Sequence, residues 1–318
     1  MTTPATLEQH LASYLALRRS LGFKLVQHQQ QLEGFARYCR AGGASHITVD
    51  LALAWATTPG AAQPGWYRMR LGMVGSFASY LHALDPVHQL IPVNVLGIRG
   101  YDRPPPYLFT PGQITSLVEH AATAACRNTS MTRHAFFGLA GVTGIRPGEA
   151  ITLPDDHVDL EGGCLTVVGG KSGAERTLPL HPSTVAALGA YRQWRDQAVP
   201  FRRHHRFFTT GRGGPLWRTD LETVFRDLAA QLGHQARTPR CRPCLKSLRH
   251  SFAVNTLISW YSQGIDVNGR LPILSAWMGH IDPASTYWYL TASPELMMLA
   301  AARLATARQP APARTETP

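Results

Sequence analysis

Most of the residues that could carry out chemistry in this chain lie in four short polar segments separated by apolar sequence. Their arginines can grip the oxygens of a phosphate in a bidentate way and stay charged. Their lysines and histidines can move protons, and a tyrosine can form a covalent ester. Such a combination suits transfer of a phosphodiester, in which negative charge builds up on the phosphate oxygens. The segments are Thr143–Glu149, Gly170–Gly173, Lys246–His250 and Gly279–Tyr289.

Taken in order, these segments resemble the motifs of the tyrosine recombinases of the phage-integrase type. Thr143-Gly-Ile-Arg146-Pro-Gly-Glu149 is similar to their Gly-Leu-Arg-x-x-Glu box. Lys246-Ser-Leu-Arg249 is similar to their His-x-x-Arg box, and Gly279-His280 to their Leu-Gly-His box. Tyr289 stands nine residues after His280, at the place of the family's nucleophile, and Thr286 matches a threonine that commonly precedes it. Each box alone is common in proteins, but the ordered set at these spacings is specific and covers the whole chain.

The resemblance implies a role for each of these side chains. Arg146 and Arg249 would stabilise the charge that develops on the non-bridging oxygens. Lys171, in a glycine-rich turn between the two arginine boxes, would donate a proton to the departing 5′ oxygen. His280 would hydrogen-bond the phosphate or the nucleophile. Tyr289 would attack phosphorus and hold the 3′ end of the DNA as an ester, so religation needs no ATP, divalent metal or other cofactor.

Two positions complicate this assignment. Lys246 stands where the family most often has histidine, and a proton shuttle there would require the lysine to lose its charge near neutral pH. We therefore expect Lys246 to act as a third cationic anchor for the phosphate. The chain has only three lysines against abundant arginine, which makes Lys171 and Lys246 stand out. Tyr287 lies two residues before Tyr289 but off the family register, so we expect it to pack in the core or contact DNA.

Composition agrees with a nucleic-acid partner and limits the other classes. The formal net charge is +11 with a pI near 9.9, which favours a polyanion. The 44% hydrophobic content excludes disorder of the whole chain. No apolar stretch reaches the roughly 20 residues of a membrane span and no signal-peptide pattern opens the chain, so we expect a cytoplasmic, nucleoid-associated protein. Five scattered cysteines suit reduced thiols, and Cys241-x-x-Cys244 is better interpreted as two loop thiols than as a zinc site.

The positioning elements are predicted to be mainly helical, with a small antiparallel sheet. Residues 1–98 read as a four-helix, core-binding DNA-binding domain without strands, in which Thr6 and Thr48 cap the first and third helices. The proline-rich segment 99–107 is the expected linker. Residues 108–306 form the expected catalytic domain, which opens with a helix capped by Thr110. We expect residues 307–318 to be a disordered tail.

Within the second domain a hairpin is expected from Cys164–Val168 through the turn at Lys171 to Arg176–Leu180. Phe207-Phe208 is expected to add a further strand. The apolar segment from Pro294 to about Ala305 resembles the family's C-terminal helix that docks on a neighbouring protomer. Its alternative is packing on its own domain.

The partners implied by the resemblance are double-stranded DNA and three further copies of the chain, as a homotetramer on two synapsed sites. The two domains would then clamp opposite faces of the duplex through phosphate contacts. The preferred function is that of a site-specific integrase or transposase. Alternatives are a resolvase or topoisomerase-like enzyme with the same site, a non-catalytic DNA-binding accessory protein, and a helical protein that binds an acidic protein.

Overall fold

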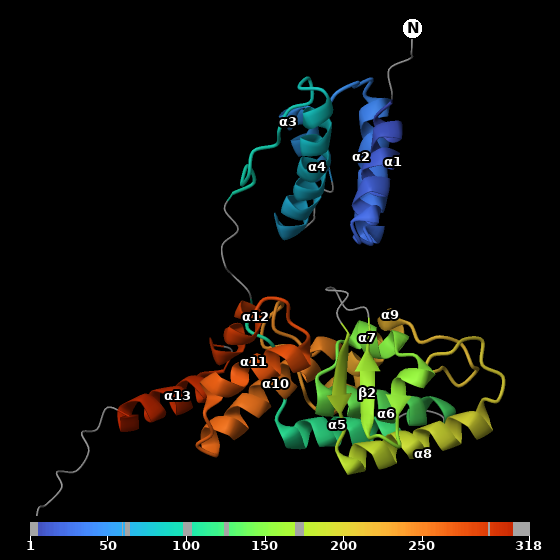
Figure 1. Ribbon diagram of the computed structural model, residues 1–318, viewed down its shortest axis with the longest axis vertical. Coiled ribbons are helices and arrows are strands. Elements are labelled where there is room, and N and C mark those ends of the chain that lie inside the picture. Colours follow the sequence, from blue (N-terminus) through green and yellow to red (C-terminus); the bar gives the residue numbers. More distant parts are fainter. Residues whose placement is uncertain are drawn as a thin grey trace, which may run out of the picture. The chain divides into compact units, whose positions relative to one another are not determined.

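The computed structural model describes residues 6–58, 60, 64–97, 104–123, 127–168, 175–291 and 293–307. The chain divides into two compact units, one ending at Arg103 and the other beginning at Pro104 (Figure 1). The described part is mainly helical, with one three-stranded antiparallel sheet, so the predicted fold class is confirmed.

The first unit is built from four helices: α1 (Leu7–Ser20), α2 (Val26–Ala41), α3 (Val49–Thr57) and α4 (Pro64–Leu84). Thr6 and Thr48 cap α1 and α3 through their side-chain oxygens, as their place in the sequence predicts. The apolar faces meet in one core that includes Phe35, Trp55 and Phe77. No strand occurs among the residues described in this unit, in agreement with the sequence pattern.

The second unit combines a small sheet with helices. Its elements are α5 (Pro111–Thr123), α6 (Arg127–Thr143), α7 (Pro147–Thr152), η1 (Asp155–His157), β1 (Val158–Asp159), β2 (Cys164–Val167), β3 (Arg176–Pro179), α8 (Pro182–Ala198), α9 (Arg218–Gln231), α10 (Leu245–Ser262), α11 (Val267–Met278), α12 (Ala284–Tyr287), η2 (Trp288–Thr291) and α13 (Pro294–Ala307). The sheet has the order β1-β2-β3, and Leu165 on β2 pairs with Leu178 on β3. Both leucines are buried, which fixes the register of the hairpin.

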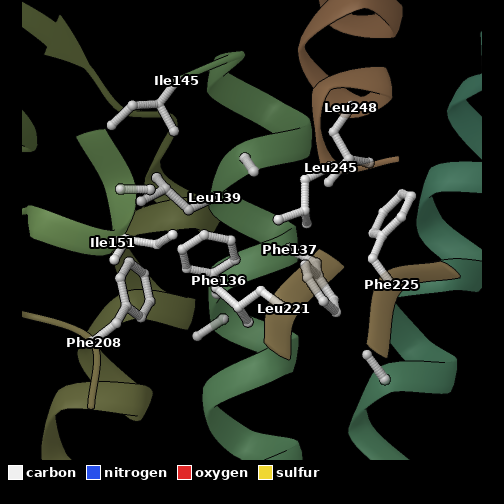
Figure 2. Close-up of a cluster of buried hydrophobic side chains, with 14 of the residues drawn as sticks. Phe136, Phe137, Leu139, Ile145, Ile151, Phe208, Leu221, Phe225, Leu245 and Leu248 are labelled. Carbon is white, nitrogen blue, oxygen red and sulfur yellow. The ribbon is translucent and has the colours of Figure 1, made fainter. Parts of the chain in front are cut away.

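Helix α6 lies in the middle of the main core of this unit. Phe136 and Phe137 on α6 are fully buried, and their rings lie against Phe208 and Phe225 respectively (Figure 2). Leu248 on α10 belongs to the same cluster, so the core joins the helices that carry the two arginine motifs. The close packing of these buried side chains holds the ends of α6 and α10 in fixed positions.

Beside the core, a buried ion network holds the connection from α7 to the sheet. Arg195 on α8 has 1% of its side chain exposed and donates to both carboxylate oxygens of Asp155, at 2.8 and 3.1 Å. It also donates to the Phe207 carbonyl at 2.7 Å. A buried guanidinium needs such partners, since its desolvation is costly.

The expected strand at Phe207-Phe208 is not formed. The two rings are fully buried against each other and against Tyr191, with only an isolated bridge between Pro154 and Arg206 beside them. The aromatic pair is therefore there for core packing and not for sheet pairing. Conversely, the two-residue strand β1 has too short a pattern to be predicted.

Three expectations fall partly or wholly on residues outside the described ranges. They are the hairpin turn with Lys171, most of the 99–107 linker, and the tail from residue 308. Pro104–Tyr107, the described end of the linker segment, forms neither helix nor strand. None of the helices in the described part is long and apolar enough to cross a membrane.

Candidate active site

Arg146 lies in the turn between α6 and α7. Helix α6 ends at Thr143. The next residue, Gly144, has a left-handed φ of +62°, and a Cβ there would lie 2.5 Å from the Phe252 ring. Only glycine suits both conditions. Arg146 then takes extended angles as the N-cap of α7, and its backbone N–H donates to the carboxylate of Glu149 at 3.1 Å. The glycine of the first motif thus serves to aim the arginine that follows it.

Glu149 bridges two arginines. Its side chain is 8% exposed, with Oε1 2.7 Å from Arg146 Nη1 and Oε2 2.6 Å from Arg176 Nη2. Burial by itself raises the pKa of Glu149, but the hydrogen bonds and charges of Arg176 and Arg146 outweigh it and hold the pKa below its ordinary value. The carboxylate is therefore ionised at neutral pH, and it holds both arginines in place.

Arg249 enters the same place from α10. Its side chain is nearly buried, and it donates through Nη1 to the Gly144 carbonyl at 2.7 Å and through Nη2 to the Met278 carbonyl. Burial, and then the charge of Arg146, lowers the pKa of Arg249 to about 10. The guanidinium remains charged at neutral pH. Three of its five N–H groups are directed to described residues, which leaves two for a phosphate.

The C-terminus of α11 gathers the three arginines. Its last carbonyls, on Trp277, Met278 and Gly279, accept hydrogen bonds from Arg176, Arg249 and Arg146 respectively. Cations at this end of a helix are stabilised by its partial negative charge.

Gly279 permits this arrangement because it ends α11 in a left-handed conformation, with φ +62°. A Cβ at Gly279 would lie 2.8 Å from Nη1 of Arg176 and 3.1 Å from Nη1 of Arg146. Any other residue would therefore press on two of the guanidinium groups that the helix end holds.

His280 follows directly and has both ring nitrogens engaged. Its Nε2 lies 3.0 Å from Arg249 Nη2, and its Nδ1 lies 2.7 Å from the hydroxyl of Thr286. Because a guanidinium only donates, Nε2 must accept, and the proton of the neutral ring then sits on Nδ1, facing Thr286. Thr286 is buried on α12 and so fixes the tautomer of His280.

Tyr289, and not Tyr287, faces this cluster. Tyr289 in η2 is 1% exposed, and its ring is stacked on His280 with 6.1 Å between centroids. Its hydroxyl lies 3.0 Å from Nδ1 of His250. Tyr287 is 52% exposed at the end of α12, so the expectation of core packing is wrong for it. Of the two roles expected for Tyr287, only contact with DNA is compatible with this exposure.

The two lysines differ in what can be said of them. Lys246 is exposed in the first turn of α10, and no described residue forms a hydrogen bond or ion pair with its side chain. It is three residues before Arg249, so both side chains lie on neighbouring positions of one helix face. Lys171 lies outside the described residues. The structure thus brings Arg146, Arg249, His280 and Tyr289 together, with Lys246 one turn away.

Sequence reasoning gave no role to two residues of this cluster, Arg176 and His250. Arg176 on β3 is 12% exposed and completes the pair of arginines on Glu149. A charged residue on a short strand is normally solvent-exposed, so its type alone carried no signal. His250 was visible in the segment Lys246–His250, and its position next to Arg249 was the available signal.

The cysteine pair takes no part in the cluster. Cys241 is buried, and Cys244 is the N-cap of α10. Within the described ranges, no group of three or more histidine, cysteine or acidic side chains is arranged to hold a metal ion.

Comparison with known proteins places this geometry in a family. Residues 108–295 match the phage integrase family. The chain is 40% identical over 306 residues to a putative integrase/recombinase, y4rB, of Sinorhizobium fredii (strain NBRC 101917 / NGR234), covering 94% of this chain and 97% of the relative. A second protein of that strain described in the same way, y4rE, is 30% identical, with 93% and 95% covered. Among solved structures, the Tn1549 transposon integrase in complex with transposon right end DNA is similar, with a TM-score of 0.66, 17% identity and 95% and 99% covered.

Proposed function

The chain belongs to the phage integrase family and is a tyrosine recombinase, an enzyme that breaks and rejoins DNA strands, and from this premise we propose that it is a site-specific recombinase with Tyr289 as its nucleophile. One observation carries the choice of residue. His280 contacts the Arg249 guanidinium at 3.0 Å and stacks on the ring of Tyr289, so the tyrosine shares a site with two groups that we expect to bind the phosphate.

In the proposed reaction the scissile phosphate lies against Arg146 and Arg249, whose remaining N–H groups bind the non-bridging oxygens. The Tyr289 oxygen attacks phosphorus, and the bond to the 5′ oxygen breaks. Lys171 donates a proton to that oxygen, and Lys246 is a third cationic anchor. The 3′-phosphotyrosine keeps the energy of the broken bond, so a 5′ hydroxyl from a second DNA strand can reverse the step and complete the exchange.

Covalent trapping tests this proposal. Randomised nicked duplexes, from which the 5′ product strand escapes after cleavage, are incubated with the full chain and the protein–DNA adducts are separated on a denaturing gel. We expect adducts from the wild type and from Tyr287→Phe, and none from Tyr289→Phe, although Tyr289→Phe still binds DNA. Adducts from Tyr289→Phe together with an inactive Tyr287→Phe would refute the assignment. Salt-dependent binding without any adduct would instead identify a DNA-binding accessory protein.

We propose the role of an integrase or transposase for the enzyme, because the 40% identical relative that shares nearly its whole length is described as a putative integrase/recombinase. A resolvase with the same site is the alternative. Sequencing the trapped duplexes gives a preferred site, and two plasmids carrying that site then separate the roles. Joining of the two plasmids supports integration, while exclusive resolution of sites within one plasmid supports the alternative. With DNA as substrate, we place the enzyme in the bacterial cytoplasm with the nucleoid.

We also propose a homotetramer on two synapsed sites, with α13 docking on a neighbouring protomer. Leu296 of α13 is buried beside α10 of its own chain, whereas Met297, Met298 and Leu304 are each more than half exposed. An exposed apolar face of this kind is available to a neighbour.

Truncation before α13 would also remove the buried Leu296, so a double substitution of the exposed face, Met298→Glu with Leu304→Glu, is the sharper test of docking. We expect it to weaken synapsis of two duplexes more than binding to one duplex. Equal loss in both assays would count against docking between protomers.

A further inference from the structure

His250 lies where the proton of Tyr289 must leave. It follows Arg249 on α10 and is half-buried, with its ring packed edge-on against Trp288 at 5.7 Å between centroids. Its Nδ1 is 3.0 Å from the Tyr289 hydroxyl, a hydrogen-bond distance. Tyr289 is almost fully buried, so bulk water has little access to that hydroxyl. An imidazole nitrogen at this distance is well placed for proton transfer.

The neighbouring groups are less suited to take this proton. The ring of His280 stacks on that of Tyr289 with the two planes 19° apart, and its two nitrogens are the atoms that could accept a proton. Both of those nitrogens are already engaged by Arg249 and Thr286. Lys246 is exposed, and an ammonium group has no lone pair with which to accept. Arg249, a further neighbour, only donates.

We propose that His250 is the catalytic proton acceptor for Tyr289, an inference that rests on the proposed function of Tyr289 as nucleophile. During attack the tyrosine O–H bond breaks and its proton moves to Nδ1 of His250, while the oxygen forms a bond to phosphorus. The 5′ oxygen leaves with a proton from Lys171. In religation the 5′ hydroxyl attacks, the phosphotyrosine bond breaks, and His250 returns its proton to the tyrosine oxygen.

The charges around His250 make this transfer depend on DNA. Arg249 carries a positive charge that interacts with Tyr289 and is repelled by Arg146, so an imidazolium beside the Tyr289 hydroxyl adds positive charge to a site that is already cationic in the free enzyme. A bound phosphodiester brings negative charge to the same guanidinium groups and offsets that repulsion.

The test measures single-turnover adduct formation on the preferred duplex identified by trapping, and on the same duplex with sulfur in place of the bridging 5′ oxygen. Sulfur leaves without a proton donor, so it bypasses a general acid but not a base that acts on the nucleophile. We expect His250→Ala to slow adduct formation on both duplexes by about 10²–10⁴, the range for general base catalysis. Lys171→Ala, the matched control on the leaving-group side, should be slow on the oxygen duplex and recover on the sulfur duplex.

His250→Asn separates proton transfer from positioning, because its amide can hydrogen-bond Tyr289 from about the place of Nδ1 but does not titrate. We expect the wild-type rate to rise with pH over the range in which histidines lose their proton, and this rise to vanish in His250→Asn but persist in Lys246→Ala. Wild-type rates in His250→Asn, or recovery of His250→Ala on the sulfur duplex, would overturn the inference. Absence of adducts from the wild type itself would refute the proposed function and the inference with it.

Discussion

Because Glu149 bridges Arg146 and Arg176, we predict a large and pH-dependent loss of stability in Glu149→Gln. The substitution keeps the size of the side chain and one acceptor oxygen. It removes the negative charge that lies between Arg146 and Arg176 and points an N–H₂ group at one of them. Since the carboxylate is only 8% exposed, water can replace little of what is lost.

Breaking a buried ion pair from one side costs about 3–5 kcal/mol, and we expect the lower end because glutamine keeps one acceptor. For a unit of this size, about 3 kcal/mol lowers the melting temperature by about 6–12 °C. Thermal unfolding at neutral pH, followed by circular dichroism, measures the shift. Glu161→Gln is the matched control, because Glu161 is exposed, and should change stability by less than about 0.5 kcal/mol.

The same comparison should depend on pH in one direction. Burial raises the pKa of Glu149, but the arginine hydrogen bonds bring it below the ordinary value of 4.5. A lowered folded-state pKa contributes stability that is fully present above pH 4.5 and is lost as the pH falls through the folded-state value. The difference in free energy of unfolding between wild type and Glu149→Gln should therefore be constant above pH 4.5 and become smaller below it. A difference under 1 kcal/mol at neutral pH, or one that does not narrow in acid, would refute the role of the bridge.

Three further changes have expected outcomes. Gly279→Ala should cost at least about 1 kcal/mol for its left-handed backbone and slow adduct formation, because the new Cβ presses on Arg176; unchanged adduct rates would contradict it. Asp155→Asn removes one of the two described carboxylates that pair with the buried Arg195, the other being Asp196, and should cost about 3 kcal/mol in chemical denaturation, with the adduct rate per folded molecule unchanged. Lys246→His should be tolerated, while Lys246→Ala should slow single-turnover cleavage by about 10²–10³. Cleavage at the wild-type rate in both variants would show that the lysine has no role in the site.

The helices could be predicted from the sequence because local rules and tertiary packing agree in them. The capping threonines, Thr6, Thr48 and Thr110, each accept a hydrogen bond from the helix that follows. The strand expected at Phe207-Phe208 was wrong because aromatic residues are frequent both in strands and in cores. Neighbours from other parts of the chain, Tyr191 on α8 and Phe136 on α6, decide between the two, and their positions are tertiary facts.

The site residues that belong to the ordered motifs could be predicted from the sequence. The site residues that join the site only through contacts across the fold could not. Glu149 is near Arg146 in the sequence, so an interaction between them could be expected. Arg176 is 27 residues further on and reaches Glu149 only because β3 lies beside α7 and the end of α11. His250 was hidden for a related reason: a histidine next to an arginine shows no partner until η2 brings Tyr289 to it.

The way in which the arginines are held also explains why the site stays cationic. If each guanidinium were paired with its own carboxylate, the charges would cancel and a phosphate would have to displace an anion. Among the described contacts, Glu149 is the one carboxylate shared by Arg146 and Arg176, and the remaining anchors are neutral carbonyls at the end of α11. Arg249 is held by carbonyls and His280 alone, and burial with the charge of Arg146 lowers its pKa to about 10. These contacts fix the orientation of the guanidinium groups but do not neutralise their charge. The negative charge of a bound phosphate therefore relieves the repulsion between Arg249 and Arg146 and raises the pKa of Arg249 again. The relief grows as the transition state gains charge, which is the condition under which binding energy becomes catalysis.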